Sequence, residues 1–435
     1  MMGLWDRFFY MWYSMDIETI FKWGWYIFLL DIPRFFVIEG ITLFWSRYQR
    51  YKTKDLWEKA RLDLFNDMPL VTVLVPGHNE GKHLYKLVQS MKKQTYNKLE
   101  VIVIDDGSTD DTAIIGRSFE RSGQIDRFLS TVERGGKASA ANLGLRYSTG
   151  KYVVHLDADS SLNDDAIEKI LIPFYRFENI GGVGGNLIVR NEEESLTTTM
   201  QFLEYLQSIN VSRVVLSKLN LYKIISGAFG AFPREVLDRI GGWDIGPGLD
   251  GDITVKIRKI NFRILFEEEA ICKTHVPVTW KALTKQRLRW SRSLVRFRIR
   301  KHKDVWLPNK NFKLVNFISF FENVFFSLIL DLLWFFYIFK ILLTEPSFLI
   351  FWFPFKYSIY LLLTLGQYFF AIVISNDKKR LFSKIIYIPL FPIYMGYYMR
   401  TVRTISYLDE FLFYDSYKDV WNPLKTSKKA REFGM

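Results

Sequence analysis

The order of apolar and polar positions divides the chain into one soluble-looking stretch with apolar segments on either side. Residues 21–46 are mostly apolar and long enough to span a bilayer. Between residues 66 and 290, short β-branched runs alternate with helical patterns. Apolar segments return near 315–343, 350–375 and 382–399. This pattern predicts a folded α/β domain with membrane helices before and after it.

Three β-branched runs in the middle stretch predict strands at 71–76, 101–104 and 152–156, with a helix over about 82–94 after the first. Strands that alternate with helices indicate a largely parallel, Rossmann-like sheet. In such sheets, ligands bind at the carboxyl ends of the strands. The pairs Asp105/Asp106 and Asp157/Asp159 both follow predicted strands, so they fall where a ligand is expected.

The N-terminal part, residues 1–65, is predicted to contain an interfacial helix, a transmembrane helix and a basic linker. Asp31 and Arg34 interrupt the transmembrane helix. Because isolated charges are costly in a bilayer, we expect these two side chains to pair with each other on a protein-facing side. The basic linker predicts that the domain at 66–290 is cytoplasmic.

After the domain, residues 291–312 are basic and aromatic, which is typical of an amphipathic helix on the inner membrane face. Residues 313–400 are predicted to form transmembrane helices, and residues 401–435 a basic tail. The segment 382–399 contains two prolines and leaves two arrangements open. If this segment spans the bilayer, the tail lies outside, and if it is interfacial, the tail stays inside.

Composition and charge favour a membrane protein. Of 435 residues, 49% are hydrophobic and 17% aromatic, which is heavy for a soluble protein. The net charge of +13 would suggest nucleic-acid binding in a soluble protein, but here basic residues sit beside apolar segments, where anionic lipids attract them. We therefore expect membrane lipids as partners and no nucleic acid. The single cysteine, Cys272, excludes a disulfide framework and a cysteine zinc site.

Two acidic signatures follow predicted strands. In Asp105-Asp106-Gly107-Ser108, a carboxylate can accept a hydrogen bond from a nucleobase or ribose, although a strand-to-helix turn with a capping residue is an alternative. In Asp157-Ala158-Asp159, two carboxylates supply the hard oxygen ligands that suit Mg²⁺ or Mn²⁺, which in turn hold a diphosphate. Such a triplet is common by chance, so its weight comes from the second acidic strand end in the same domain.

Two glycine-rich segments also carry candidate groups. In Arg134-Gly135-Gly136-Lys137, glycines and a cation at a helix start predict an anion site, unless the segment is a simple helix entry. Its spacing is not that of a Walker A loop. In Asp250-Gly251-Asp252, a carboxylate facing a cleft can act as general base towards a sugar hydroxyl, and the alternative is a pair of helix caps.

The most specific signature is Gln286-Arg287-Leu288-Arg289-Trp290. In a helix, Gln286, Arg289 and Trp290 lie on one face. Arg289 is suited to a phosphate, and Trp290 can stack on a sugar. The alternative is a basic amphipathic helix with a tryptophan at the membrane interface.

Together and in this order, these residues resemble the membrane-bound family-2 glycosyltransferases, which include cellulose, chitin, hyaluronan and poly-N-acetylglucosamine synthases. That family shows a D, DxD, (T/E)D and QxxRW series, and the resemblance covers about residues 66–300. It implies a GT-A-type α/β domain plus an α-helical transmembrane region. It also implies an inverting hexosyl transfer from a UDP-sugar, with Mg²⁺ or Mn²⁺ as cofactor.

The resemblance also implies roles for single residues. On the donor side, uridine would be bound by Asp105 and Asp106 with Lys137 nearby, and the diphosphate would be held through the metal by Asp157 and Asp159. Asp250 would be the base. The groups that close over the pyrophosphate and the acceptor would be Gln286, Arg289 and Trp290, with Ser226 and Gly227 in an acceptor-contacting segment. One departure concerns Leu249, which stands where the family often has an acidic residue, so Asp252 is a rival for the base.

The function expected from this resemblance is a processive polysaccharide synthase, a multi-pass plasma-membrane protein that extends a β-linked polymer and passes it across the membrane. UDP-GlcNAc and UDP-Glc are the expected donors. The alternative is a single sugar addition to a lipid acceptor, such as a polyprenyl phosphate or a glycolipid. A non-catalytic nucleotide-sugar binding protein is disfavoured by the intact set of Asp157, Asp159 and Asp250.

Overall fold

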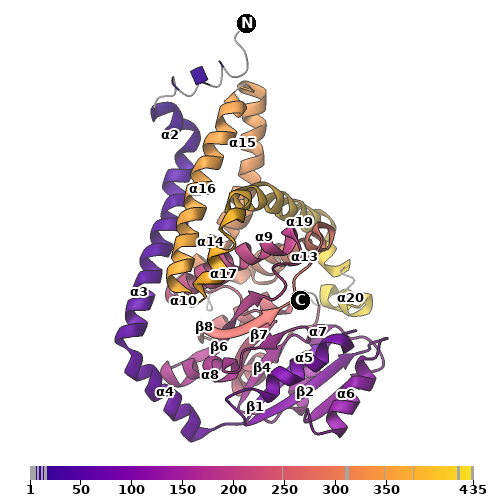
Figure 1. The fold of residues 1–435 in the computed structure, drawn as a ribbon. Coiled ribbons are helices and arrows are strands. Elements are labelled where there is room, and N and C mark those ends of the chain that lie inside the picture. Colours follow the sequence, from indigo (N-terminus) through magenta and orange to yellow (C-terminus); the bar gives the residue numbers. More distant parts are fainter. Residues whose placement is uncertain are drawn as a thin grey trace.

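The computed structural model describes a sheet domain at one end and long apolar helices at the other (Figure 1). The described residues are 6, 9–10, 13, 17–246, 248–308, 313–346, 348–375, 377–418 and 422–432. The predicted interfacial helix over residues 1–20 falls largely outside them, as does Pro247 in the loop before Asp250.

One eight-stranded sheet organises the domain, in the order β3-β2-β1-β4-β7-β6-β8-β5. The predicted strands at 71–76, 101–104 and 152–156 are confirmed as β1, β2 and β4. The strands are β1 Val71–Gly77, β2 Leu99–Asp106, β3 Arg127–Thr131, β4 Tyr152–Leu156, β5 Ser161–Leu162, β6 Ile180–Val189, β7 Phe229–Pro233 and β8 Arg263–Thr274.

The sheet is mixed rather than largely parallel. Strands β3, β2, β1 and β4 run parallel, as expected from alternating strands and helices. Strand β7 is antiparallel to both β4 and β6, and β5 is antiparallel to β8. Strand β7 returns to the sheet only after several helices, so the local alternation that predicted a parallel sheet does not reveal its direction.

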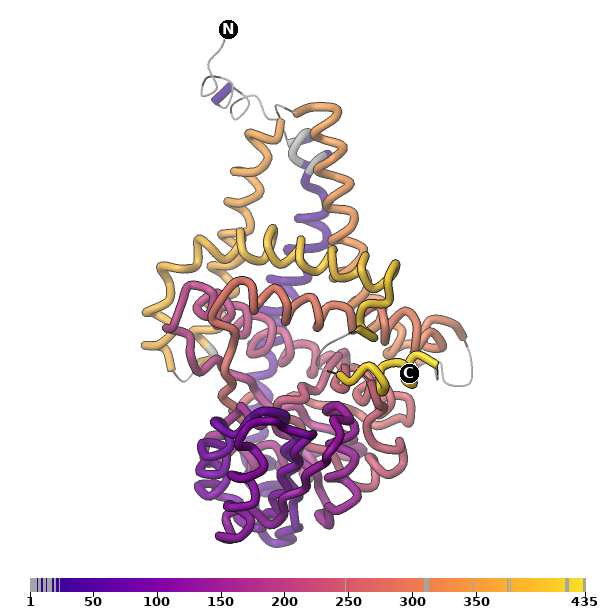
Figure 2. Tube along the Cα trace, turned by 90° about the vertical axis from the view of Figure 1, so that its right-hand side faces the viewer, coloured from indigo at the N-terminus to yellow at the C-terminus, as the bar shows by residue number. Residues whose placement is uncertain are grey.

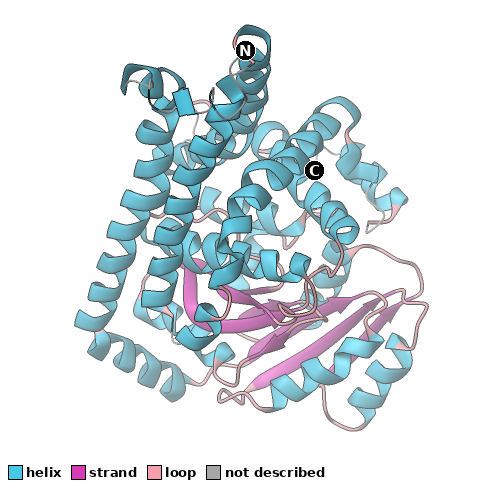
Figure 3. Cartoon of the chain, turned by 45° about the horizontal axis from the view of Figure 1, so that its top comes forward, coloured by secondary structure: helices cyan, strands magenta, loops and turns pink. Residues whose placement is uncertain are grey.

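Helices cover the sheet and connect its strands (Figures 1 and 3). The predicted helix over about 82–94 is confirmed as α5. Helix α7 packs on β1 and β2, α8 packs on β6 and β8, and α4 packs on α8. The helices of this part are α4 Lys54–Asp67, α5 Gly81–Lys92, α6 Thr112–Arg121, α7 Lys137–Tyr147, α8 Ala166–Arg176, α9 Leu196–Tyr205, η3 Leu206–Val211, α10 Ser212–Lys218, α11 Arg234–Ile240 and α12 Leu249–Lys259.

The N-terminal helix runs from α2 to α3, with its charges turned towards the protein. The sequence predicts that Asp31 and Arg34 pair with each other, and this prediction is wrong. Instead, Tyr360 donates to Asp31, whereas Arg34 donates to Glu322 at 2.8 Å and lies 3.3 Å from Glu39. Each charge finds its partner on another helix or one turn away. The segments are α2 Ile17–Tyr26, η1 Ile27–Asp31, η2 Pro33–Ile38 and α3 Glu39–Lys52.

Two helices in the described part of the chain are long and apolar enough to cross a membrane. The first spans Leu314–Thr344 with a mean hydropathy of 2.1, and the second spans Phe348–Val373 with a mean hydropathy of 1.6. They comprise α14 Leu314–Val324, η6 Phe325–Ile329, α15 Leu330–Thr344 and α16 Phe348–Ile374. The predicted third and fourth spans, at 21–46 and 382–399, do not meet this test, so the structure leaves a multi-pass arrangement as a proposal.

The segment around 382–399 is broken into short helical pieces. They are α17 Lys378–Phe382, η7 Ile385–Leu390, α18 Phe391–Ile393 and η8 Tyr394–Met399, followed by α19 Arg400–Phe413. Figure 2 shows α19 running across the direction of α15 and α16, and α19 packs on α13. Arg400 and Arg403 both donate to Asp331 at the start of α15, which fastens this crossing helix to the apolar pair.

The predicted interfacial helix over 291–312 is the second half of a longer element. Helix α13 begins at Trp280 and continues without a break through η4, Leu294–Lys301. Arg296 and Arg298 are 2% and 3% exposed, so these cations face the protein interior. A short helix, η5 Lys303–Val305, follows, and residues 309–312 lie outside the described part.

The C-terminal tail packs against the sheet domain. Its described elements are η9 Asp415–Lys418 and α20 Leu424–Glu432. Thr426 donates to the Gly135 carbonyl at 3.2 Å, and the side chain of Ala430 lies against Gly246. The tail and the domain therefore lie on the same side of the apolar helices, as the interfacial arrangement of 382–399 predicts.

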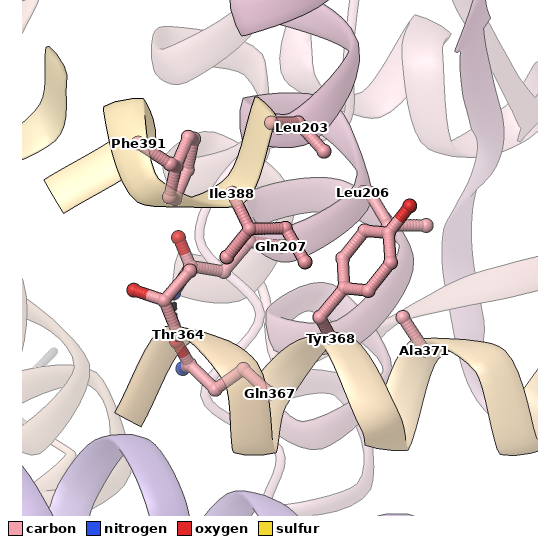
Figure 4. Close-up of a pocket in the computed structure, with 9 residues that line it drawn as sticks. All are labelled: Leu203, Leu206, Gln207, Thr364, Gln367, Tyr368, Ala371, Ile388 and Phe391. Atoms are coloured by element: carbon pink, nitrogen blue, oxygen red, sulfur yellow. Dashed lines mark hydrogen bonds between the residues drawn. The ribbon is translucent and has the colours of Figure 1, made fainter. Parts of the chain in front are cut away.

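A small cavity marks the junction between the domain and the apolar helices (Figure 4). Its volume is about 20 Å³, and it is lined from α9, η3, α16 and the pieces around η7. Gln207 of η3 donates to Gln367 of α16, and Gln367 in turn donates to Glu39 at 2.9 Å. None of the predicted site residues lines this space, so it belongs to the junction rather than to the chemistry.

Candidate active site

The carboxyl ends of β2, β1 and β4 lie next to one another and bring the two acidic signatures together. In the sheet order, β1 lies between β2 and β4, and Gly77 at the end of β1 is in register with Asp105. Asp106 ends β2, and Asp157 directly follows β4. Parallel strands present their carboxyl ends at one edge, which is why residues 51 positions apart in sequence meet here.

Both carboxylates of the first signature hold loops in place. Asp105 is 1% exposed and accepts from Ser108 N–H at 3.0 Å and Ser130 Oγ at 2.9 Å. Asp106 accepts from the backbone N–H groups of Gly135 and Gly136, at 2.7 and 2.8 Å. Of the two, Asp106 is thus the one that shapes the predicted anion loop, while Asp105 organises the turn beneath it.

The predicted anion loop leads directly into a helix whose first residue is a cation. Gly136 has φ +90° and precedes the first residue of α7, Lys137. A side chain at Gly136 would collide with Asn422 of the C-terminal tail. The tail therefore lies directly over the loop, a contact that the sequence did not predict.

Lys137 connects the donor side of the site to the predicted base. Its ammonium donates to Asp157 Oδ1. Burial alone would lower the pKa of Lys137, but the Asp157 and Asp250 carboxylates outweigh this effect and raise it. Lys137 is therefore a cation held between two carboxylates from different parts of the chain.

The DxD pair has the character of a cation site. Burial and the neighbouring Asp157 raise the pKa of Asp159, as expected for like charges held close together. A divalent cation would relieve this repulsion, and carboxylate oxygens are the ligands that Mg²⁺ and Mn²⁺ prefer. In the described part of the chain, no group of three or more acidic, histidine or cysteine side chains is arranged for a metal. The two aspartates thus fit a metal that takes its remaining ligands from a diphosphate or water.

Asp250 lies at the start of α12, against the segment that contains Gly227. The Gly227 N–H donates to the Asp250 carboxylate, and a side chain at Gly227 would collide with it. Burial raises the pKa of Asp250, while Lys137, the Gly227 N–H and Arg289 oppose that shift. The structure therefore brings Asp250, Lys137 and Arg289 together, as the motif series predicted, and places Gly227 beside them.

Asp252, the other candidate for the base, lies in a different environment from Asp250. It is 3% exposed and lies 2.8 Å from His302 Nε2 and 2.7 Å from Lys301 Nζ. Burial alone would raise the pKa of Asp252, but these two partners lower it. A carboxylate engaged in this way is a poor proton acceptor, so the geometry favours Asp250 as the base.

The QxxRW residues lie on α13, above the site. Arg289 is close enough to Asp250 to lower its pKa. Trp290 is 44% exposed, and the guanidinium of Arg287 lies 4.3 Å from its ring centroid. Arg287 itself is buried and paired with Glu204 at 2.9 Å. Gln286 is half-buried, and the structure records no contact from it to the other site residues described here.

Three further groups border the site without having been predicted. Burial, Asp159 and Asp157 raise the pKa of Glu80 to about 7. His78 Nδ1 donates to the Asp106 carbonyl at 3.0 Å. Both follow β1, the strand between the two acidic ends, so their position after a buried strand was a usable signal. The third group is His155, which sits inside β4 where an apolar residue is the rule.

Residues 72–241 match the family model described as glycosyl transferase family 2. This part of the sheet domain is therefore similar to glycosyl transferase family 2. The matched residues include Asp105, Asp106, Lys137, Asp157 and Asp159, whereas Asp250 and the QxxRW helix lie beyond them.

Curated relatives agree with this likeness. The chain is 31% identical over 256 residues to poly-β-1,6-N-acetyl-D-glucosamine synthase of Staphylococcus epidermidis, and this match covers 58% of the chain and 61% of that protein. The same enzyme of Staphylococcus aureus (strain COL) is 31% identical over 277 residues, which is 61% of this chain and 64% of the relative. The chain thus spans a little over three fifths of the length of these relatives.

A solved structure supports the fold of the glycosyltransferase. The mannosyltransferase PcManGT from Pyrobaculum calidifontis, in complex with GDP-Man and Mn²⁺, superposes with a TM-score of 0.54 at 20% identity. The match covers 86% of this chain and 99% of that one. The mixed sheet, the acidic strand ends and this likeness together show a GT-A-like glycosyltransferase fold.

Proposed function

We propose that this chain is a polysaccharide synthase: a processive, inverting β-glycosyltransferase that transfers a sugar from a UDP-sugar to a growing glycan. The observation that carries the proposal is the convergence of Asp250, Lys137 and Arg289, with Asp157 paired to Lys137. It combines a proton acceptor with cations suited to a diphosphate. The relatedness to two poly-β-1,6-N-acetyl-D-glucosamine synthases supports UDP-GlcNAc as the first donor to test.

The donor would lie along the carboxyl edge of the sheet. We assign the nucleoside to the region of Asp106 and the loop that it holds, and the diphosphate to Lys137 and Arg289. Asp157 and Asp159 would hold Mg²⁺ or Mn²⁺, which supplies positive charge next to the leaving diphosphate when bound. Support for a divalent metal comes from the Mn²⁺ in the mannosyltransferase of the same fold.

The chemistry is a single displacement at the anomeric carbon. Asp250 removes the proton from an acceptor hydroxyl as that oxygen forms the new bond to the sugar. The bond between the anomeric carbon and the diphosphate breaks, and UDP leaves with the electron pair. Attack from the face opposite to the leaving group inverts the anomeric configuration, which makes a β-glycoside from an α-linked donor. General base help of this kind contributes roughly 10²–10⁴-fold.

The acceptor would enter from the side of α13. Trp290 offers an exposed ring face for a sugar, while Gly227 borders the base and Ser226 precedes it in the chain. We further propose that the protein is integral to the plasma membrane, with its sheet domain in the cytoplasm, and that the glycan passes out between the apolar helices. Support for this placement comes from the two long apolar helices and the crossing helix α19 beneath them.

One assay tests the proposal. Full-length protein in nanodiscs is incubated with radiolabelled UDP-GlcNAc and Mn²⁺ or Mg²⁺, and the product is sized, with Asp250→Asn as the inactive control. A high polymer supports the synthase, and a single-sugar glycolipid shows the alternative transferase. Transfer from GDP-mannose but not from UDP-sugars would overturn the donor class. Polymer formation by Asp250→Asn at the wild-type rate would overturn the base.

A further inference from the structure

We propose that His155 is a positioning residue for Asp250, acting through the backbone of Gly227. This role rests on the proposed sugar transfer with Asp250 as its base. His155 lies on β4, two residues before the DxD pair begins. It acts on a carboxylate that is 95 positions away in the sequence.

The first link is the hydrogen bond between His155 and Gly227, in which His155 is the donor. His155 Nδ1 lies 2.6 Å from the Gly227 carbonyl oxygen. A carbonyl only accepts hydrogen bonds, so Nδ1 must carry the proton and donate.

The second link runs from Gly227 to the base. The N–H of the same residue donates to the Asp250 carboxylate. Gly227 is thus held at its carbonyl by a strand and touches the base with its amide. Any side chain on Gly227 would occupy the place of the carboxylate, so glycine is what lets Asp250 lie directly against the backbone.

The segment that contains Gly227 forms a tight turn before β7. Phe229 N–H donates to the Ser226 carbonyl at 3.2 Å, and Ala228 N–H to Ser226 Oγ at 3.3 Å. The turn enters β7 only at Phe229, which pairs with Leu156. Gly227 therefore precedes the part of the chain that the sheet itself aligns, and the imidazole holds it where ladder hydrogen bonds do not.

Burial of the His155 imidazole at this strand position is energetically unfavourable. His155 is 1% exposed, every residue of β4 is buried, and its Nε2 has no hydrogen-bond partner among the described residues. Leaving a buried polar atom unsatisfied costs about 1–3 kcal/mol. An aliphatic side chain would fill this strand position without that cost, so the useful feature of the histidine is its Nδ1 donor.

The arrangement ties the two sides of the reaction to one strand. Asp157, at the end of β4, pairs with Lys137 on the donor side, and its N–H donates to the Ala228 carbonyl at 3.2 Å. His155, on the same strand, sets the Gly227 backbone on the acceptor side. The distance between leaving group and base is therefore governed by a single rigid element.

Matched variants test this role. In His155→Asn, the amide nitrogen falls near the position of Nδ1 and keeps the donor, whereas in His155→Gln it falls near Nε2 and cannot reach Gly227. We expect His155→Gln to lower kcat by about 10- to 100-fold, the cost of misplacing a reacting group by about 1 Å. Its KM for the UDP-sugar and its Kd for UDP should stay at wild-type values. His155→Asn should recover most of kcat.

The outcomes separate this role from its alternatives. Equal kcat in wild type and His155→Gln would overturn the positioning role while leaving the proposed function intact. Equal impairment of both variants, with weaker UDP binding or a lower Tm, would assign His155 to folding and overturn it as well. A wild-type protein that transfers no sugar would remove the proposed function and the positioning role with it. If His155→Gln does not fold, His155→Leu takes its place in the comparison, because it fills the strand position with an aliphatic side chain and lacks the Nδ1 donor.

Discussion

Lys137, the first residue of α7, forms an ion pair with Asp157, the residue that follows β4. The pair joins the glycine-rich loop to the DxD signature. The same ammonium lowers the pKa of Asp250, which burial alone raises. One cation therefore balances two carboxylates to which we assign different tasks.

Replacement of Lys137 by methionine should move the pH profile of the transferase. The pKa of Asp250 lies above its ordinary value because of burial, so the carboxylate form, which the base requires, is lost as the pH falls through that raised pKa. Without Lys137 the pKa rises further, and the acid limb of kcat should shift upwards by about one pH unit or more. Steady-state rates between pH 4 and 8, with Lys137→Arg as the charge-preserving control, measure the shift. An unmoved acid limb would show that Asp250 does not control it.

Asp250→Asn and Asp252→Asn form a matched pair two residues apart on α12. The first should lower kcat by roughly 10²–10⁴-fold while UDP still binds, because only the proton acceptor is lost. The second removes the partner of Lys301 and His302, so it should lower the free energy of unfolding by about 1–3 kcal/mol. Its kcat, measured at a temperature where the variant is folded, should fall far less. Calorimetric titration of UDP and thermal melts complete the comparison, and the reverse pattern would make Asp252 the base.

Much of the site was accessible from sequence because its residues sit at the ends of recognisable elements. Asp106 and Asp157 follow β-branched runs, and Lys137 follows two glycines, so local patterns place them at the carboxyl edge of a sheet. The same local logic predicted β1, β2 and β4. It failed for the direction of β7, because pairing order depends on contacts made after several intervening helices.

The rest depended on partners far apart in the sequence. In the sequence, Asp252 resembled a second base, but in the structure it is hydrogen-bonded to His302, 50 residues later. Asp31 was expected to pair with Arg34, but Tyr360 lies 329 positions away and takes that role. The packing of Asn422 on Gly136 likewise joins two ends of the chain. No periodicity encodes such contacts, since each depends on how complete elements pack.

Trp290 should contribute to acceptor binding through its exposed face. Arg287 already covers part of the ring, whose remaining 44% exposure leaves room for a sugar. An aromatic contact of this kind is worth roughly 0.5–1.5 kcal/mol, so Trp290→Ala should raise the KM for an oligosaccharide primer by about 2- to 12-fold. Trp290→Phe should retain most of the affinity. Primer titrations at saturating donor measure the effect, and a changed donor KM with an unchanged primer KM would contradict it.

The contact between α20 and Gly135 predicts that the C-terminal tail orders the glycine-rich loop before α7. Thr426 donates to the Gly135 carbonyl, while the N–H of Gly135 is held by Asp106. A typical hydrogen bond of this kind adds roughly 0.5–1.5 kcal/mol, so Thr426→Val should speed amide exchange of the loop around Gly135 by about 2- to 12-fold. Thr426→Ser keeps the hydroxyl and should exchange like wild type. Hydrogen-exchange mass spectrometry of peptides covering residues 130–140 measures the difference, and peptides from β1 serve as the internal control. Equal protection in all three proteins would show that the tail rests on the loop without ordering it.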